Sequence, residues 1–433
     1  MTVILRLNKH GLLPMIRGRA QSTTCLCLER SERNEKINMK ILMIVLDGLG
    51  DRVYAELGGM TPLEYAKTPN LDIFASKSMC GNLYALGPGL RPSSDVAHME
   101  LFGIDHNVYY TGRGPIELAG LNIPFGKNDI AFRGNFVVKD SANIIVDRRS
   151  KRQAPEKDVL QCLRKVEIDK TTFELYHIAE HRFALKVSGS KVDPHICDSD
   201  PHIENVSIKR IEATIDSENA RYTADIMNRY VDYVNSILLE KGSSSNSILL
   251  RGAGIKPKWY SFKEKYDLSA ACIANNALYN GIGSLLQMNV LHSKYTKNYK
   301  EYYNQIQHII DLEAVGYDFV FLHLQEGDLF GEDGNIKGKV CAIEEMDKAL
   351  AFINELPEDI VVAITSDHST PCCLRAHSGD AVALAIYGPN CRKDQVVRFS
   401  ERTCYKGILG TVLGKDFLRL VLDAAGRSVL IGG

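Results

Sequence analysis

The chain has 433 residues, which exceeds the length of one ordinary domain and suggests two or three. Its 45% hydrophobic and 24% charged residues are typical of soluble globular proteins. A formal net charge of −1 excludes a bulk electrostatic attraction to nucleic acid or membrane, and no apolar run approaches the ~20 residues of a membrane helix. We therefore expect neither partner, and an anionic substrate would need a local cluster of Arg and Lys.

The first 38 residues differ from the rest of the chain. From Met1 to Leu28 there is no acidic residue, but four basic ones occur among scattered Ser and Thr: Arg6, Lys9, Arg17 and Arg19. This composition resembles a mitochondrial or plastid transit peptide. Two alternatives stay open, a disordered tail and a wrongly assigned start codon with Met39 as the true first residue. Residues 1–38 are thus predicted to be a disordered or targeting extension.

The 11 cysteines form no CxxC pair. The closest pairs, Cys25 with Cys27 and Cys372 with Cys373, do not fit a zinc ribbon, so reduced thiols in an oxidant-poor compartment are the simpler interpretation. We expect a cytoplasmic protein, with organellar import if the N-terminal extension is genuine.

Three short, nearly continuous apolar runs predict buried strands of a sheet that is covered on both faces. They are residues 41–46 (ILMIVL), 319–324 (FVFLHL) and 360–365 (IVVAIT). Helical patterns lie between them, and the clearest apolar stripe recurs every three or four residues at Val340, Ile343, Met346, Leu350 and Ile353. This alternation predicts an α/β fold with a doubly wound sheet.

The middle of the chain is richer in charge and less regular than its ends. The polar stretch 241–245 (KGSSS) predicts a flexible boundary. Because candidate metal ligands occur on both sides of this region, we expect a sheet domain made of residues 39–108 and 248–433. An α+β domain, residues 109–247, is inserted into it.

Each predicted strand is followed closely by an acidic residue, Asp47, Asp328 or Asp367. Ligands of open α/β sheets bind at the carboxyl ends of the strands. Any one of these residues alone is more simply a loop residue or a helix cap. Three carboxylates at one edge, with His368 and His377 nearby, instead indicate a metal site, and Gly48 allows the sharp turn that directs Asp47 to that edge.

Ser94, in the segment Ser94-Asp95-Val96-Ala97-His98, enters a predicted helix. Spacing alone favours a helix N-cap. A divalent metal beside the serine would favour a nucleophile, because the metal lowers the hydroxyl pKa without a histidine base. Asp367 and His368 suit one metal and His377 can reach a second, and two metals ~4 Å apart would clamp a transferring phosphoryl group.

Several longer motifs occur in order from about Met39 to near the C-terminus: MKILMIVLDGLGD, TPLEYAKTPNLD, SSDVAH, YTGRGPIELAG, AFRGNF, VDRRS, LLRGAG, AACIA and SDHSTPCCLRAHSGD. With them the chain resembles the archaeal-type cofactor-independent phosphoglycerate mutases, members of the alkaline phosphatase superfamily. The resemblance implies an alkaline-phosphatase-like sheet domain. It also implies an isomerase of glycolysis and gluconeogenesis that interconverts 3-phosphoglycerate and 2-phosphoglycerate through a phosphoserine, independently of 2,3-bisphosphoglycerate.

The resemblance also implies residue roles. Ser94 resembles the phosphorylated nucleophile. The ligands of the family's first metal ion are matched here by Asp47, Ser94, Asp367 and His368. Two ligands of its second metal ion are matched by Asp328 and His377. Residues that match the substrate-binding motifs are Arg113, Arg133, Asp147, Arg148, Arg149 and Arg182. Guanidinium groups suit the phosphate and carboxylate of phosphoglycerate, although a surface ion-pair network is a competing interpretation for Arg113 and Arg182.

Two positions depart from the family pattern. Glu332 stands where a metal-binding histidine is expected, and as an oxygen ligand four residues after Asp328 it favours Mn²⁺ or Mg²⁺, with Zn²⁺ and Co²⁺ as alternatives. Ser269 stands where the family has a lysine that meets the phosphoryl group. Lys265, one helical turn earlier, is predicted to substitute for it.

These departures leave two alternatives to a two-metal mutase. One is a metal-dependent phosphatase of the same superfamily, and the other is a catalytically impaired binding homologue. The expected partner is the small molecule phosphoglycerate. The sequence leaves open whether the chain forms a homo-oligomer.

Overall fold

The apolar runs of the sequence form the centre of an eight-stranded sheet. The computed structural model describes residues 39–431 except 294, 295, 297, 313 and 315, so the predicted extension 1–38 lies outside the described residues. The strand order is β10-β9-β11-β1-β12-β13-β2-β14. The bounds are β1 Lys40–Leu46, β2 Met79–Tyr84, β9 Ala270–Ala274, β10 Asn289–His292, β11 Phe319–Leu324, β12 Ile360–Thr365, β13 Val382–Tyr387 and β14 Gly410–Leu413.

The three predicted strands are confirmed as β1, β11 and β12, and they are neighbours. β1 pairs in parallel with β11 on one side and with β12 on the other. The sheet is mixed, because β13 runs antiparallel to both β12 and β2. The carboxyl ends of the three predicted strands therefore meet at one edge of the sheet.

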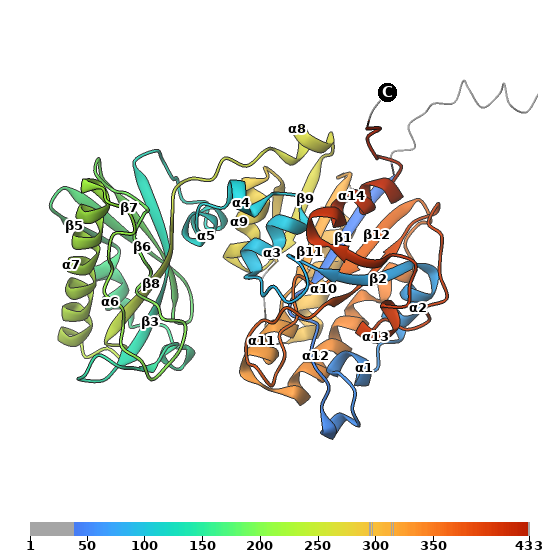
Figure 1. Cartoon of the computed structure of the whole chain (residues 1–433), viewed down its shortest axis with the longest axis horizontal. Helices are drawn as coiled ribbons and strands as arrows, with labels where there is room; N and C mark the ends of the chain where they lie inside the picture. Colours follow the sequence, from blue (N-terminus) through green and yellow to red (C-terminus); the bar gives the residue numbers. More distant parts are fainter. Residues whose placement is uncertain (1–38, 294–295, 297, 313, 315, 432–433) are drawn as a thin grey trace, which may run out of the picture. The chain divides into compact units, whose positions relative to one another are not determined.

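Helices cover both faces of this sheet, as a doubly wound fold requires (Figure 1). Alternate side chains of β1 enter opposite cores: Ile41, Met43 and Val45 enter one, and the residues between them enter the other. The first core is covered by α3 Ser94–Leu101, α8 Phe262–Tyr266, α9 Ala277–Leu285 and α14 Gly414–Ala424. The second is covered by α1 Pro62–Tyr65, α2 Pro69–Lys77, α10 Tyr299–Leu312, α12 Ile336–Ala349 and η3 Leu350–Asn354.

The predicted apolar stripe after Lys339 is confirmed in α12 and η3, whose five stripe residues are all buried. The remaining elements of this part of the chain are short: η1 Ala55–Leu57, α4 His106–Tyr109, α5 Arg113–Gly120, α11 Glu326–Asp333 and α13 Glu401–Cys404. Within the described residues, no helix is both long enough and apolar enough to cross a membrane.

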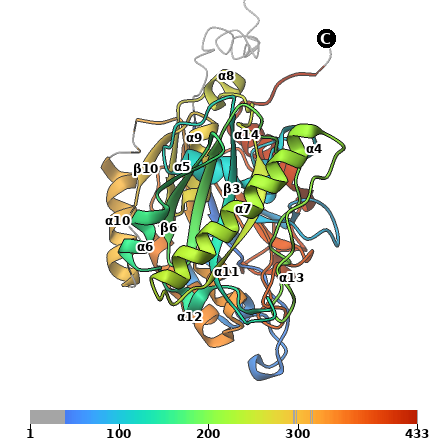
Figure 2. The same cartoon turned by 90° about the vertical axis from the view of Figure 1, so that its left-hand side faces the viewer.

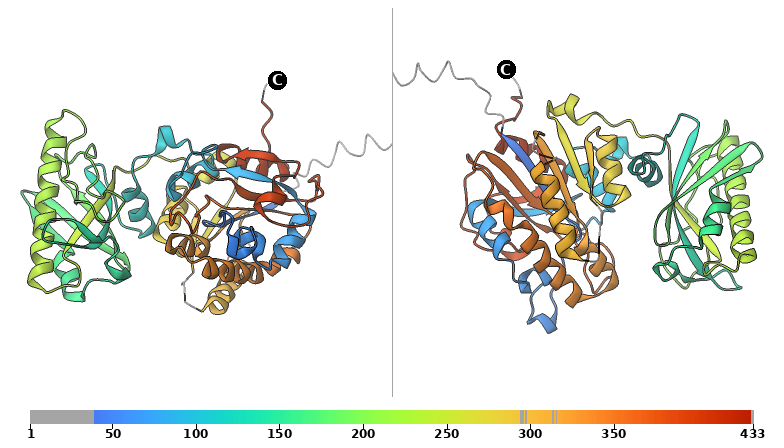
Figure 3. Two further views of the ribbon diagram at one scale, coloured as in Figure 1. Left: turned by 60° about the horizontal axis from the view of Figure 1, so that its bottom comes forward. Right: turned by 180° about the vertical axis from the view of Figure 1, so that it is seen from behind.

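The middle of the chain forms a second, six-stranded antiparallel sheet, ordered β4-β3-β7-β6-β5, in which β8 also pairs with β3. Its strands are β3 Asp129–Lys139, β4 Ile145–Asp147, β5 Lys165–Ile168, β6 Thr171–Ala179, β7 Arg182–Ser188 and β8 Ser247–Gly254. The helices are η2 Ser150–Arg152, α6 Lys157–Leu163 and α7 Glu218–Glu240. Figures 1 and 2 show α7 along one face of this sheet, and Figure 3 gives two further views.

The polar stretch 241–245 is the turn between α7 and β8. β8 then pairs antiparallel with β3, so the chain returns to the second sheet before it leaves at Gly254. Part of this region looks irregular in the sequence because some of its strands are buried on alternate residues, as in β6, where Thr171, Phe173 and Leu175 are buried.

Candidate functional site

Carboxylates and histidines gather where β1, β11 and β12 end. Asp47 directly follows β1, and one residue separates Asp367 from the end of β12. Asp328 lies on α11 after β11. Gly48 has a φ of +61°, and a Cβ atom there would lie 2.6 Å from the Cα of Asp328. Glycine is thus required for the loop after β1 to approach α11 this closely, as the sequence predicted.

Asp47, Asp367 and His368 form a group that could hold one metal ion, here called the first metal set, and their ligand atoms lie within 4.8 Å of one another. His368 Nε2 is 3.6 Å from Asp47 Oδ1 and 3.1 Å from Asp367 Oδ2. Both carboxylate oxygens are buried, and among the described residues neither accepts a hydrogen bond. Buried, unpaired carboxylate oxygens that face an imidazole nitrogen fit a divalent cation.

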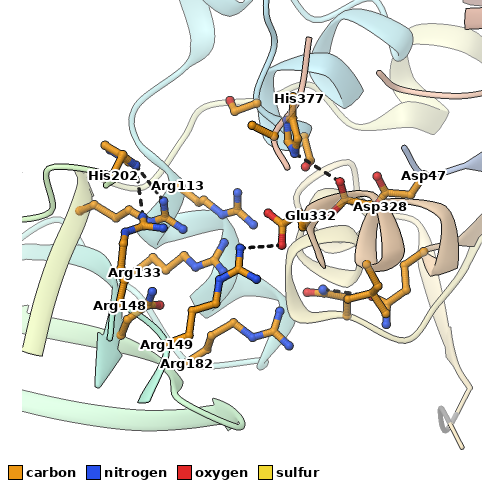
Figure 4. A pocket seen from close by; sticks show the side chains of 18 of the residues that line it. Asp47, Arg113, Arg133, Arg148, Arg149, Arg182, His202, Asp328, Glu332 and His377 are labelled. Atoms are coloured by element: carbon orange, nitrogen blue, oxygen red, sulfur yellow. Dashed lines mark hydrogen bonds and ion pairs between the residues drawn. The ribbon is translucent and has the colours of Figure 1, made fainter. Parts of the chain in front are cut away.

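The second metal set consists of Asp328, His368 and His377, within the same 4.8 Å limit. His377 donates from Nδ1 to the Pro92 carbonyl over 2.9 Å, and its Nε2 lies 3.4 Å from Asp328 Oδ1 (Figure 4). A ring nitrogen tied to a backbone carbonyl while the other faces a carboxylate is the usual arrangement of a metal-binding histidine. His368 belongs to both sets, and its ring stacks on that of His377 with centroids 3.6 Å apart.

The electrostatics of these carboxylates also favour a cation. Burial, with the nearby charges of Asp367 and Asp328, raises the pKa of Asp47 well above its ordinary value. Burial raises the pKa of Asp328 too, but the hydrogen bond and charge of His377 and the charge of His368 outweigh it and hold that pKa at about 2. Three carboxylates share a buried space, and a divalent ion would offset their mutual repulsion.

Ser94 lies next to the first metal set. It is the first residue of α3, and Ser93 occupies the N-cap position, so Ser94 is not the cap. The Ser94 side chain is buried, and its Oγ lies 3.3 Å from His368 Nε2. Ser94 also lines the cavity described next.

A cavity of about 560 Å³ connects these residues to the second sheet. On one side lie Ser94 and the metal-set residues Asp47, Asp328 and His377. Nine arginines, here called the arginine cluster, also line it: Arg91, Arg113, Arg133, Arg148, Arg149, Arg152, Arg182, Arg251 and Arg375. Figure 4 shows members of the cluster across the cavity from Asp47 and Asp328. A cavity with nine arginines and four acidic residues suits an anion.

The deepest arginines are crowded by one another. Arg113 Nε lies 3.0 Å from Glu117 Oε1, and Arg133 Nη1 lies 3.6 Å from the same atom. Burial, with the charges of Arg113 and Arg251, lowers the pKa of Arg133 well below its ordinary value. Burial and Arg113 also lower the pKa of Arg251 to about 10. Glu117 lies beside Arg113 and Arg133, and Asp200 Oδ2 lies 3.8 Å from Arg251 Nη1. A bound anion would offset more of the repulsion among these cations.

Three predicted substrate residues have other partners in the structure. Arg148 makes two hydrogen bonds to Asp200, of 2.8 and 2.5 Å. Arg149 donates to Glu332 over 3.0 Å. Asp147 does not line the cavity; its carboxylate accepts from the backbone N–H groups of Arg149 and Lys151. Asp147 thereby shapes the loop in which residues 150–152 all have left-handed φ angles.

Two predicted site residues lie elsewhere than expected. Glu332 shares α11 with Asp328, but its carboxylate pairs with Arg149 and is not among the grouped metal-ligand atoms. Lys265 does not line the cavity: its Nζ lies 3.7 Å from the centre of the Tyr260 ring and donates to the Gly103 carbonyl. Ser269 stands where the family has the lysine that Lys265 was predicted to substitute for, and it donates from its backbone N–H and its hydroxyl to Asp318, the residue before β11.

Sequence reasoning missed several lining residues. Arg251 lies in the LLRGAG motif, which could have identified it. No motif in the sequence indicated a role for Tyr279, yet its hydroxyl donates to Asp47 Oδ2 over 2.5 Å. His181 is adjacent to Arg182 and lines the cavity, and burial with the charge of Arg182 lowers its pKa to about 3, so its ring is neutral at pH 7.

An α/β sheet with buried Asp and His groups at its carboxyl edge, beside a serine and an arginine-lined cavity, is the arrangement expected of a metalloenzyme. In agreement, the family described as the metalloenzyme superfamily matches residues 39–424.

Proteins with similar sequences indicate which family of metalloenzymes the chain belongs to. The 2,3-bisphosphoglycerate-independent phosphoglycerate mutase 1 of Methanothermobacter thermautotrophicus is 36% identical over 91% of this chain and 100% of its own. The corresponding mutase of Thermoplasma volcanium is 38% identical over 90% and 98%. The chain therefore belongs to the family of 2,3-bisphosphoglycerate-independent phosphoglycerate mutases.

Solved structures agree with this membership. The cofactor-independent phosphoglycerate mutase from Thermoplasma acidophilum has a TM-score of 0.61 and 31% identity, covering 90% of this chain and 100% of that one. A Pyrococcus horikoshii protein has a TM-score of 0.73 and 30% identity, covering 91% and 99%. Together, the superfamily and the grouped Asp and His residues support dependence on divalent metal.

Proposed function

We propose that this chain interconverts 3-phosphoglycerate and 2-phosphoglycerate through a phosphoserine at Ser94, without 2,3-bisphosphoglycerate. The observation that carries the proposal is the single cavity that joins Ser94 and both metal sets to the arginine cluster. The substrate carries a phosphate and a carboxylate, which are the two groups that guanidinium forks bind best. Family membership supports the same reaction.

The proposed cofactor is two divalent ions, one in each metal set, with Mn²⁺ or Mg²⁺ preferred. Ions bound there would lower the pKa of the Ser94 hydroxyl and neutralise charge on the phosphoryl oxygens. The chain would supply Asp47, Ser94, Asp367 and His368 to one ion and Asp328 and His377 to the other. Because Glu332 pairs with Arg149, the preference for hard ions depends on the aspartates and Ser94 rather than on Glu332.

The proposed chemistry has two phosphoryl transfers. Ser94 Oγ forms a bond to phosphorus, the bond from phosphorus to the substrate oxygen breaks, and that oxygen gains a proton in exchange for the one that the serine hydroxyl loses, leaving glycerate in the cavity. The glycerate turns, its other hydroxyl oxygen attacks the phosphorus, and the bond to Ser94 Oγ breaks. Arg113, Arg133 and Arg251 would hold the glycerate carboxylate during this turn, since their mutual repulsion is relieved by an anion.

We further propose that residues 39–108 and 248–433 act as the metal-binding domain and residues 109–247 as an inserted substrate domain. Strand β8, which runs on to Gly254 within the second sheet, would move with the inserted domain. The inserted domain supplies Arg133, Arg148 and Arg149 to the cavity. Excluding water there would protect the phosphoserine from hydrolysis. The proposed reaction supports a cytoplasmic location, or an organellar one if the N-terminal extension is a genuine targeting segment.

Turnover of 2-phosphoglycerate and 3-phosphoglycerate tests the proposal. Mutase activity is measured by coupling to enolase, with Mn²⁺, Mg²⁺, Zn²⁺ or Co²⁺, and inorganic phosphate is measured in the same samples. We expect mutase turnover that greatly exceeds phosphate release. Phosphate release without mutase turnover would instead identify a phosphatase, in which water replaces the trapped glycerate. The absence of both activities and of a phosphoserine would identify a binding homologue.

A further inference from the structure

One buried hydroxyl lies between the two metal sets. Thr370 Oγ1 is 2.8 Å from Asp328 Oδ1, a residue of the second set. The same oxygen is 3.1 Å from His368 Nδ1, the histidine that both sets share. Thr370 has no exposed surface and does not line the cavity, so it touches the ligands and not the substrate.

The directions of these two hydrogen bonds follow from the number of protons. An ionised carboxylate only accepts, so Thr370 donates its single hydroxyl proton to Asp328. His368 must then donate from Nδ1 to the oxygen of Thr370. That arrangement leaves the lone pair of His368 on Nε2, the atom that faces Asp367 Oδ2 and Ser94 Oγ. One hydroxyl thus fixes both a histidine tautomer and a carboxylate orientation.

The backbone of Thr370 is itself held in place. Its N–H donates to the Gly50 carbonyl over 3.0 Å. Its carbonyl accepts from the ammonium of Lys339, a fully buried side chain that also donates to Gly50 and Asp51. A Cβ atom at Gly331 would lie 2.3 Å from the Thr370 carbonyl oxygen. The loop after β1, the start of α12 and α11 therefore leave Thr370 little freedom to shift.

We propose that Thr370 is a positioning residue shared by the two metal sets. Its hydroxyl selects the His368 tautomer that presents Nε2 as a metal ligand, and it orients Asp328 for the second ion. This inference rests on the proposed two-metal function and extends it by naming the group that couples the two sets. Loss of such a supporting hydrogen bond commonly weakens metal affinity by about 10- to 100-fold.

The test compares three variants by metal titration. Thr370→Val keeps the shape and removes the hydroxyl, and Thr370→Ser keeps the hydroxyl. Thr365→Val is the matched control, since this threonine is equally buried in the preceding strand and its hydroxyl donates to the Ala383 carbonyl. Co²⁺ is the probe, because its visible absorption reports ligand geometry, and binding stoichiometry and melting temperature are measured on the same proteins.

We expect Thr370→Val to bind Co²⁺ about 10- to 100-fold more weakly and to show an altered absorption spectrum. Thr370→Ser should restore both, and Thr365→Val should lower the melting temperature while leaving both unchanged. If Thr370→Val does not fold, Thr370→Ala is titrated with the same expectation.

Three outcomes separate the positioning role of Thr370 from the proposed two-metal function. If the wild-type protein binds two Co²⁺ ions and the valine or alanine variant binds them with the same affinity and spectrum, the positioning role is wrong and the proposed function stands. Thr370→Ser binding as weakly as Thr370→Val would also overturn the role of the hydroxyl. A wild-type protein that binds fewer than two ions contradicts the proposed two-metal function, whatever the variants do.

Discussion

Replacing Glu332 with glutamine separates two roles for this residue. The sequence predicts a metal ligand, whereas in the structure Glu332 Oε2 accepts from Arg149 Nη2 over 3.0 Å. As a ligand, its loss would weaken metal binding and slow the reaction. As a partner of Arg149, its loss would free a guanidinium for the substrate. Because the glutamine keeps the shape of the side chain, the variant changes only the charge and the hydrogen-bonding atoms.

The size of the effect follows from the exposure of the pair. The two side chains are 31% and 30% exposed, and ion pairs of this kind contribute about 0.2–1 kcal/mol. The upper value corresponds to about fivefold in an equilibrium constant. Asp333 Oδ1 lies 3.8 Å from Arg149 and would retain part of the attraction. We therefore expect KM for phosphoglycerate to fall by about two- to fivefold in Glu332→Gln, with kcat and metal affinity unchanged.

The assay is the enolase-coupled reaction, with metal affinity measured separately by titration. Asp333→Asn is the control, because it removes a neighbouring charge of α11, which pairs with Arg152, and keeps the Arg149–Glu332 pair. Its KM should change less than that of Glu332→Gln. A Glu332→Gln variant with weaker metal binding and a kcat more than about tenfold lower would refute this reasoning and restore Glu332 as a ligand.

Three further substitutions test the cavity and the fold. Arg148→Lys should raise KM and lower the melting temperature more than Arg149→Lys, because Arg148 makes two hydrogen bonds to Asp200 that an ammonium does not reproduce; equal or absent effects on KM would place both arginines in a structural ion network. Burial raises the pKa of the Glu401 carboxyl from 4.5 to about 7. The preference of the folded state for the protonated carboxyl therefore stabilises the protein fully below pH 4.5, and this stabilisation is lost as pH rises to about 7. Glu401→Gln should therefore melt like the wild type at pH 5 and be more stable by about 1–3 kcal/mol at pH 8; a variant less stable at both pH values contradicts this.

The residues grouped at the carboxyl edge of the sheet were predictable because they follow recognisable strands. Continuous apolar runs identified β1, β11 and β12, and the carboxyl ends of parallel neighbours necessarily meet. Asp47, Asp367 and His368 are brought together for this reason. The pattern did not give the strand order, which arises from pairings between segments hundreds of residues apart.

Lys265 does not reach the cavity, contrary to its predicted role, for a local reason. Its predicted equivalence to position 269 assumed that a helix continues through both residues. Helix α8 instead ends at Tyr266, and Asp267 adopts a left-handed conformation with φ +54°. The four-residue spacing then no longer places Lys265 and Ser269 on one face.

Glu332 and Tyr279 illustrate what spacing does not contain. Glu332 does share a helix with Asp328, as the sequence predicts, but its partner is Arg149, which is 183 residues away in the chain. Tyr279 bonds to Asp47 across 232 residues. Such contacts depend on the packing of whole elements, and a single sequence carries no periodicity that reports them.

The measurement that tests the central claim most directly is the trapping of a phosphorylated enzyme. Metal-loaded protein is mixed with 2-phosphoglycerate, quenched in acid and digested, and the phosphorylated peptide is identified by mass spectrometry. We predict phosphate on Ser94, and a loss of turnover greater than about 10³-fold in Ser94→Ala with metal stoichiometry and melting temperature retained. Phosphate on another residue, or turnover of Ser94→Ala within about tenfold of the wild type, would contradict a phosphoserine mechanism at this site.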